Sequence, residues 1–232
     1  MTLPRVAVEA LGAGEIHVWH LPIDGSAIPR LSELLAPDER ERAVRFAFDR
    51  DRHQFVATRA WLRLLLSRYL EQSPERIGFV PGPQGKPAIP DGPPLHFNVS
   101  HSGSRALLAF APDRELGADV EAVTAARDLP DLAASCFSTA ELAVYRRDGR
   151  PETFYRFWTG KEAYIKAVGG GLSIPLQDFS VGLDREATRS IAITRDPALP
   201  ALAVEWLPAV PGYQAAVAAA GTDWRVRLFE LP

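Results

Sequence analysis

Three acidic residues and a lysine are the side chains of this sequence best suited to chemistry at a phosphate group. Asp119 and Glu121 lie two residues apart in the stretch GADVE. On a strand, alternate side chains share a face, with Cα atoms about 6.5–7 Å apart. Neighbouring carboxylates repel each other unless they are solvated, protonated or bridged by a cation. Mg²⁺ suits such a pair, because it binds one or two carboxylates together with waters and substrate phosphates. Acids at the solvated end of a strand are the ordinary alternative.

Glu162 and Lys166 lie four residues apart in FWTGKEAYIKAVGGGL, residues 157–172. The spacing of its apolar residues predicts an amphipathic helix that ends at three glycines. Glu162 and Lys166 lie outside the apolar arc, on a face that must meet water or a ligand, although such a pair is also ordinary surface chemistry. Lys161 projects from inside the arc, so we expect it to extend outward or to reach an anion at the rim.

A second group of residues suits phosphate oxygens. The stretch FNVSHS, residues 97–102, is predicted to end a strand in a turn, with Asn98 and Ser100 facing outward. Hydroxyls and N–H groups of a turn can bind an anion, and His101 can add a hydrogen bond or a charge. A solvated histidine without a ligand is an equal alternative. The cations available to bind phosphate are Arg42, Arg45, Arg59 and Lys86. Arginine matches phosphate oxygens bidentately, but we expect only one or two of these residues to contact a ligand.

The composition is that of an ordinary globular protein. The chain has 232 residues, of which 47% are apolar and 24% charged, enough for one domain or two small ones. Its net charge of −3 argues against general binding to nucleic acid or to anionic membranes. Cys136 is the only cysteine, which excludes a disulfide framework. No stretch approaches the ~20 apolar residues of a membrane span, and the first residues lack a signal-peptide pattern. We therefore expect a cytoplasmic protein.

Helix and strand patterns occur in the same order in both halves of the chain. In the first half, the predicted elements are a strand at 16–23, helices at 36–46 and 55–70, and strands at 77–80, 95–99 and 105–111. In the second half, they are a strand at 116–121, helices beginning near Ser138 and Pro151, and strands at 179–183, 191–194, 202–206, 213–220 and 224–229. This order predicts an α+β fold of two similar subdomains, residues 1–112 and 113–232. A faint likeness between residues 58–66 and 159–167 favours duplication, and a site between the paired units is then expected.

Four stretches together resemble the Sfp-type 4′-phosphopantetheinyl transferases. They are QGKP at 84–87, FNVSHS at 97–102, GADVE at 117–121 and the helix at 157–172, in the order and spacing of that family. The resemblance covers nearly the whole chain. It implies two α+β subdomains related by pseudo-twofold symmetry, with coenzyme A and Mg²⁺ in the cleft between them. It also implies transfer of the 4′-phosphopantetheine arm of coenzyme A to a serine of an acyl or peptidyl carrier protein, with release of adenosine 3′,5′-bisphosphate.

The resemblance also implies roles for individual residues. The metal ligands fall on Asp119, Glu121 and Glu162. The coenzyme A contacts fall on Arg42, Lys86, Ser100, His101 and Lys166. Together with Asp119, two residues would be catalytic: Glu162 would take the proton of the serine, and Lys166 would stabilise or protonate the leaving phosphate. One departure is Glu39, at a position where a relative has lysine. An acid there would not hold phosphate, so the 3′-phosphate must depend more on Arg42, Lys86 and His101.

Two other classes of function stay open for the sequence alone. A Mg²⁺-dependent hydrolase of coenzyme A or nucleotides would use the same acids with water as the nucleophile. A module that binds carrier proteins without catalysis would not need the three acids and Lys166 together. We expect a monomer, because two fused halves already provide the cleft that a dimer would otherwise form.

Overall fold

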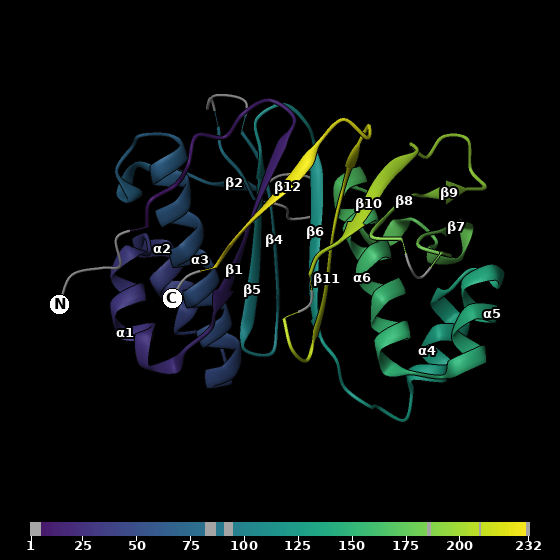
Figure 1. Ribbon diagram of the computed structural model, residues 1–232. Helices are drawn as coiled ribbons and strands as arrows, with labels where there is room; N and C mark the ends of the chain where they lie inside the picture. The colour runs from purple at the N-terminus through teal and green to yellow at the C-terminus, as the bar shows by residue number, and fades with distance from the viewer. Residues whose placement is uncertain (1–5, 82–86, 91–94, 185–186, 209, 231–232) are drawn as a thin grey trace.

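The computed structural model of the chain describes residues 6–81, 87–90, 95–184, 187–208 and 210–230 (Figure 1). Two four-stranded sheets lie in the middle of the molecule. The first has the order β12-β1-β5-β4, formed by Arg225–Glu230, Glu15–Pro22, Arg105–Ala111 and His96–Ser102. The second has the order β6-β11-β10-β8, formed by Leu116–Ala122, Tyr213–Ala220, Leu202–Trp206 and Arg189–Ile191. Two short pairs complete the strands: β2 (Val80–Pro81) with β3 (Pro87–Ala88), and β7 (Phe179–Ser180) with β9 (Ile193–Thr194).

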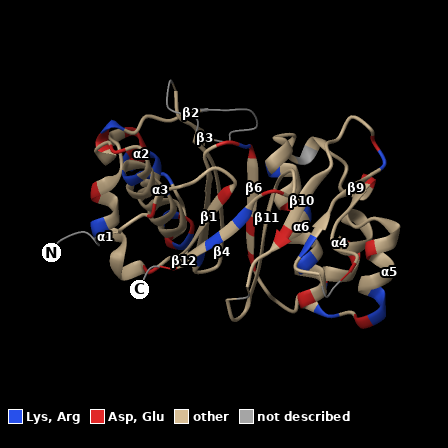
Figure 2. Ribbon diagram, turned by 45° about the horizontal axis from the view of Figure 1, so that its top comes forward, with Lys and Arg blue, Asp and Glu red and all other residues tan. Residues whose placement is uncertain are grey.

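The helices lie on the outer sides of the two sheets (Figure 1). Those of the first half are α1 (Ile28–Leu31), α2 (Pro37–Ala43) and α3 (Asp49–Tyr69). Those of the second half are α4 (Leu129–Cys136), α5 (Thr139–Asp148) and α6 (Pro151–Val168). Basic and acidic residues are mixed along α2, α3 and α5 (Figure 2). Among the described residues, no helix is long and apolar enough to cross a membrane.

The two sheets repeat one arrangement, which confirms the predicted α+β class and its two similar units. In the first, β1 is followed by helices and then by the hairpin β4–β5, and β1 pairs with β5 in antiparallel fashion. In the second, β6 is followed by helices and later by the hairpin β10–β11, and β6 pairs with β11. The last strand, β12, returns to pair in parallel with β1 of the first sheet. The boundary between residues 112 and 113 stays a prediction.

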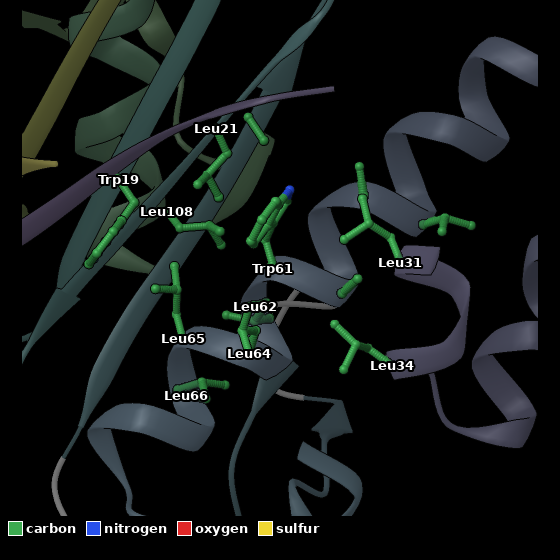
Figure 3. Packing of buried hydrophobic residues seen from close by; sticks show 14 of the residues in the cluster. Trp19, Leu21, Leu31, Leu34, Trp61, Leu62, Leu64, Leu65, Leu66 and Leu108 are labelled. Carbon is green, nitrogen blue, oxygen red and sulfur yellow. The ribbon is translucent and has the colours of Figure 1, made fainter. Parts of the chain in front are cut away.

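Apolar side chains fill the space between a helix and a sheet in each half. In the first half, Trp61 and Leu65 of α3 point toward Leu21 of β1 and Leu108 of β5 (Figure 3). In the second half, α6 packs on β10 and β11. The inner faces of the sheets pack on each other through a third cluster that includes Val18 of β1. Burial of each such side chain stabilises the fold by about 1.5–3 kcal/mol, so the two strands that carry candidate site residues, β4 and β6, are held between well-packed layers.

Several predicted boundaries are wrong for identifiable reasons. Residues 74–76 form a short 3₁₀ turn, and of the strand predicted at 77–80 only Val80 belongs to a strand. The carbonyl of Ile77 accepts a hydrogen bond from Arg63 Nη1 at 2.9 Å, so it is used by α3 and not by a neighbouring strand. The long helix of the first half starts at Asp49, six residues earlier than predicted. The predicted helix start at Ser138 is confirmed, because Ser138 and Glu141 exchange the two hydrogen bonds of a capping box.

Candidate active site

An open cavity of about 470 Å³ lies where β4, β6 and α6 meet. Its lining residues include Ser100 and His101 from β4, Asp119 and Glu121 from β6, and Trp158, Glu162 and Lys166 from α6. The structure thus brings together six of the eight residues that the sequence predicts for the site. The other two are Arg42, which lines a neighbouring cavity, and Lys86, which lies outside the described residues.

Strand β6 presents its two acids to this cavity by simple alternation. Asp119 and Glu121 both line the cavity, while Val120 between them is buried in the apolar layer between the sheets. This arrangement is the one predicted from the spacing of the two acids. Asp119 is itself almost fully buried, with 2% of its surface exposed.

A ladder of polar side chains on β4 holds the free edge of β6. The backbone N–H groups of alternate β6 residues, Ala118 and Ala122, donate to Asn98 Oδ1 and Ser102 Oγ at 3.0 and 3.1 Å. Between them, the N–H of Val120 approaches Ser100 Oγ at 3.4 Å. Asn98 and Ser100 are buried, so the expectation that they face outward is wrong. They face the second sheet, because the buried N–H groups at its edge need acceptors.

The same ladder orients both carboxylates of β6. Ser100 Oγ donates to Asp119 Oδ1 at 2.7 Å, and Ser102 Oγ donates to Glu121 Oε2 at 2.6 Å. Because β4 continues to Ser102, Ser100 and His101 belong to the strand and not to the predicted turn, which is formed by Gly103 and Ser104.

Gly117 lets β6 approach α6 closely enough to bring their acids together. A Cβ atom at this position would lie 2.0 Å from the carbonyl oxygen of Ala163 and 2.4 Å from the backbone nitrogen of Ala167. Real Cβ atoms do not approach backbone atoms this closely. A residue without a side chain is therefore required where the strand that carries Asp119 crosses the helix that carries Glu162.

Lys166 and Asp119 form the central charged contact of the site. Lys166 Nζ lies 2.6 Å from Asp119 Oδ1 and 3.2 Å from Ser100 Oγ. The other oxygen of Asp119, Oδ2, is buried and has no hydrogen-bond partner in the described part of the chain. A buried carboxylate oxygen without a partner is costly, and a cation in the cavity would satisfy it.

In the described part of the chain, the carboxylates of the cavity do not by themselves form a complete set of metal ligands. Within the described residues, no three side chains of the His, Cys, Asp or Glu type converge to hold an ion. Mg²⁺ does not need such a complete set, since it usually takes one or two carboxylates and completes its shell with waters and substrate phosphates. The acids that line this cavity, including the unpartnered Asp119 Oδ2, are a donor set of that kind.

Burial and the charge of Asp119 raise the pKa values of the two glutamates of this cavity. The pKa of Glu162 is raised to about 7, first by burial and then by the charge of Asp119, with Lys166 opposing the shift. Burial is also the main cause that raises the pKa of Glu121, while the hydrogen bond from Ser102 opposes the shift. An acid with a pKa near neutrality can exchange a proton at physiological pH, which is the property of a general base.

A smaller cavity of about 180 Å³ adjoins the first and shares Val99 and His101 with it. Arg42 lies on its rim, with its guanidinium carbon 4.9 Å from the centre of the Phe55 ring. Arg59 also lines this cavity. By contrast, Arg45 is exposed and pairs with Glu41 at 3.7 Å, so it is one of the solvated helix charges.

Comparison with known proteins agrees with this geometry. Residues 115–218 match the model of the 4'-phosphopantetheinyl transferase superfamily, and residues 24–113 match that of the 4'-phosphopantetheinyl transferase N-terminal region. The chain is 34% identical to 4'-phosphopantetheinyl transferase HetI of a Nostoc species, over 98% of this chain and 97% of the relative. It is also 34% identical to 4'-phosphopantetheinyl transferase Sfp of Bacillus subtilis, over 88% of this chain and 90% of the relative. The chain belongs to the 4′-phosphopantetheinyl transferase superfamily.

One expectation about a charged residue of this phosphopantetheinyl transferase needs correction. Lys161 neither extends outward nor reaches an anion at the rim: its side chain is fully buried and pairs with Glu141 at 2.8 Å. It also donates to the carbonyls of Leu176 and Phe179, both at 2.6 Å. Its partner lies in another helix, so the sequence pattern around Lys161 contains no sign of it. Lys161 therefore fastens the segment after α6 to α5 and α6.

Glu39, the acid at a position where a relative has lysine, is buried. It accepts hydrogen bonds from the backbone of Ala36 at 2.9 Å and from Arg63 Nε at 2.6 Å, and it pairs with Arg59 Nε at 3.5 Å. The acid is thus already neutralised by two arginines of α3.

Sequence reasoning missed three contributors to the transferase site. Trp158 forms a wall of the main cavity, which Glu121 also lines. Asn98 and Ser102 hold the edge of β6, and Ser102 orients Glu121. The period-two run of polar residues in FNVSHS was a signal for this ladder, because a strand with one polar face must meet either water or another polar edge.

Proposed function

We propose that this enzyme transfers the 4′-phosphopantetheine arm of coenzyme A to a serine of an acyl or peptidyl carrier protein in a Mg²⁺-dependent reaction. Adenosine 3′,5′-bisphosphate is the second product. The observation that carries this proposal is the meeting of Asp119, Glu162 and Lys166 in one open cavity. The adjoining cavity, lined by Arg42 and Arg59, adds positive charge where a nucleotide with several phosphates would lie.

Asp119, Glu121 and Glu162 are the residues that would hold Mg²⁺. The unpartnered oxygen of Asp119 and the raised pKa values of the two glutamates support this assignment, since a cation would stabilise all three as carboxylates. When bound, Mg²⁺ supplies positive charge that neutralises the diphosphate of coenzyme A and its leaving group.

The protein groups then have separate tasks in the transfer. The serine oxygen of the carrier attacks the β-phosphorus of coenzyme A, and the bond from this phosphorus to the oxygen of the leaving bisphosphate breaks. Glu162, whose carboxylate lines the cavity beside Lys166 and Asp119, accepts the proton of the serine. Lys166, held by Asp119 and Ser100, donates hydrogen bonds to the leaving phosphate as negative charge develops there. The open cavity leaves room for a large partner to present its serine.

Intact-mass measurement of carrier proteins tests the proposal. The chain is incubated with coenzyme A, Mg²⁺ and a panel of apo carriers, and modified carriers gain the mass of one phosphopantetheine arm. Asp119→Ala and Glu162→Gln should each reduce the rate at least about a hundredfold, within the range attributed to one general base or electrostatic group. Glu152→Gln is the matched control, because Glu152 is an exposed acid on the same helix. Near-normal rates for Asp119→Ala or Glu162→Gln, or full activity with a chelator, would contradict the mechanism.

The same assay separates transfer from hydrolysis. A hydrolase would release phosphopantetheine from coenzyme A without any carrier, because water would replace the serine. The transferase should leave coenzyme A intact until an apo carrier is added. We also propose that the chain acts as a monomer, which light scattering of the purified protein would test.

A further inference from the structure

We propose that Asn98 is a positioning residue for the transfer: through Ala118 it keeps Lys166 where the leaving phosphate must lie. The inference rests on the proposed function, and it concerns a side chain that is not among the lining residues of either cavity. Asn98 is buried, with 5% of its surface exposed, and lies on β4 of the first half. The groups assigned to the metal and to the leaving phosphate lie on β6 and α6 of the second half.

Ala118 turns both of its backbone polar groups toward the free edge of β6. The N–H and C=O groups of one strand residue point to the same side, and Ala118 is itself fully buried. Its N–H donates to Asn98 Oδ1 at 3.0 Å, and its carbonyl accepts a hydrogen bond from Lys166 Nζ at 3.3 Å. Asn98 of one half and Lys166 of the other therefore contact the same residue of β6.

The ammonium group of Lys166 is placed by three acceptors. They are Asp119 Oδ1 at 2.6 Å, Ser100 Oγ at 3.2 Å and the carbonyl of Ala118 at 3.3 Å. A lysine has three N–H donors, so these contacts together define one position for Nζ. The short contact with Asp119 holds Lys166 in place, while the two long ones can yield a donor to a phosphate oxygen. Two of the three acceptors belong to neighbouring residues of β6, so the position of this edge decides the position of Lys166.

Strand β4 is a rigid support for this edge. The backbone of Asn98 pairs with that of Ala109 in β5. The preceding residue, Phe97, is buried in the core of the first half with 4% of its surface exposed. Asn98 Oδ1 is therefore an acceptor whose place is set by the core of the first half, and Ala118 is held against it.

Loss of this acceptor should move the charged groups of the site. Asn98→Leu has a similar size but leaves the buried N–H of Ala118 without a partner, which is costly. The edge of β6 would then shift toward water or another acceptor. The carbonyl of Ala118 would move with it, and so would the next residue, Asp119.

Amine labelling of Lys166, without metal, coenzyme A or carrier, provides the test. The chain has only three lysines, at positions 86, 161 and 166, so peptide mass spectrometry can follow acetylation of each by a succinimidyl ester. One hydrogen bond corresponds to a factor of about 3 to 10. We expect Asn98→Leu to speed the labelling of Lys166 about threefold or more. Asn98→Ser, which keeps an acceptor of the kind that the ladder uses at Ser102, should fall between it and the wild type.

Phe97→Leu is the matched control. Phe97 precedes Asn98 on β4 but packs into the core of the first half, so this variant should also lower the melting temperature. It should change the labelling of Lys166 by less than about twofold. Binding of Mn²⁺ with coenzyme A present should show the same contrast: about threefold weaker or more in Asn98→Leu, and unchanged in Phe97→Leu.

Two results would overturn the inference. Unchanged labelling of Lys166 in Asn98→Leu would show that Asn98 does not position it, and an equal rise in Phe97→Leu would show that Asn98 acts only on the fold. Should Asn98→Leu not fold, as judged by its thermal transition, the labelling of Asn98→Ser against the wild type decides. Because the labelling needs neither metal nor carrier, its result stands even if no carrier is modified, so failure of the proposed transfer stays distinguishable.

Discussion

Glu162 should make the metal-free protein less stable at alkaline pH, and replacing it with glutamine should remove this penalty. The folded protein raises the pKa of Glu162 from 4.5 to about 7, mainly through burial and also through the charge of Asp119. Between these two pH values the folded state holds a proton that the unfolded state has lost. Stability is therefore lost as the pH rises from about 4.5 through about 7.

The size of this effect follows from the shift. One pKa unit corresponds to 1.36 kcal/mol, so the full shift would give about 3 kcal/mol. Because Glu162 is only partly buried, screening by solvent reduces this to about 1–3 kcal/mol. Glu162→Gln, which is neutral at every pH, should be more stable than the wild type by that amount at pH 8 and equal to it near pH 4.5. For a chain of this size the difference is about 3–10 °C in melting temperature.

Thermal denaturation with a chelator present, at pH 5, 6, 7 and 8, measures this difference. Glu152→Gln serves as the control, because Glu152 is an exposed acid of the same helix, and its melting curve should follow that of the wild type at every pH. If Glu162→Gln and the wild type lost the same stability between pH 5 and 8, Glu162 would not be a buried acid of raised pKa. The assignment of Glu162 as the general base would then lose its physical basis.

Three further changes test how the site is built. Gly117→Ala should push β6 away from α6, because its Cβ would meet backbone atoms at 2.0–2.4 Å. We expect the free energy of unfolding, measured by denaturant titration, to fall by about 1–3 kcal/mol. We also expect the transfer activity to be lost. Gly78→Ala is the control, because an added Cβ there would have nothing within 4 Å; it should change neither the stability nor the transfer activity. Lys161→Met should lower the free energy of unfolding by about 3–5 kcal/mol, because it leaves Glu141 buried without its partner. Adding Glu141→Leu to this variant should restore part of the lost stability. Ser102→Ala should raise the Mg²⁺ concentration at half-maximal rate about threefold or more, since Ser102 holds Glu121 at 2.6 Å; an unchanged Mg²⁺ requirement would contradict this role.

The sequence predicted the elements of this enzyme better than their contacts. Alternation on β6 placed Asp119 and Glu121 on one face, and helical spacing placed Glu162 and Lys166 together. These are local periodicities, which a single sequence contains. The strand predicted at 77–80 failed because Arg63, fourteen residues away, takes the carbonyl of Ile77. Such a contact has no local signature.

The error at Lys161 has a physical cause. Lys161 was expected to extend outward or to reach an anion at the rim, but it is buried against Glu141 of another helix. A buried charge needs a partner, and the sequence does not show which residue the fold will bring to it. The same limit hid the ladder from β4 to β6, because its polar run was equally compatible with solvent.

Binding of Mn²⁺, a spectroscopic substitute for Mg²⁺ at oxygen ligands, tests the central claim most directly. Electron paramagnetic resonance counts the free ion during a titration of the protein with coenzyme A present. The account predicts one ion bound per wild-type chain, with Asp119→Ala, Glu121→Gln and Glu162→Gln each weakening this binding and Glu152→Gln leaving it unchanged. No bound ion in the wild type, or equal binding in all of these variants, would contradict a metal site formed by β6 and α6.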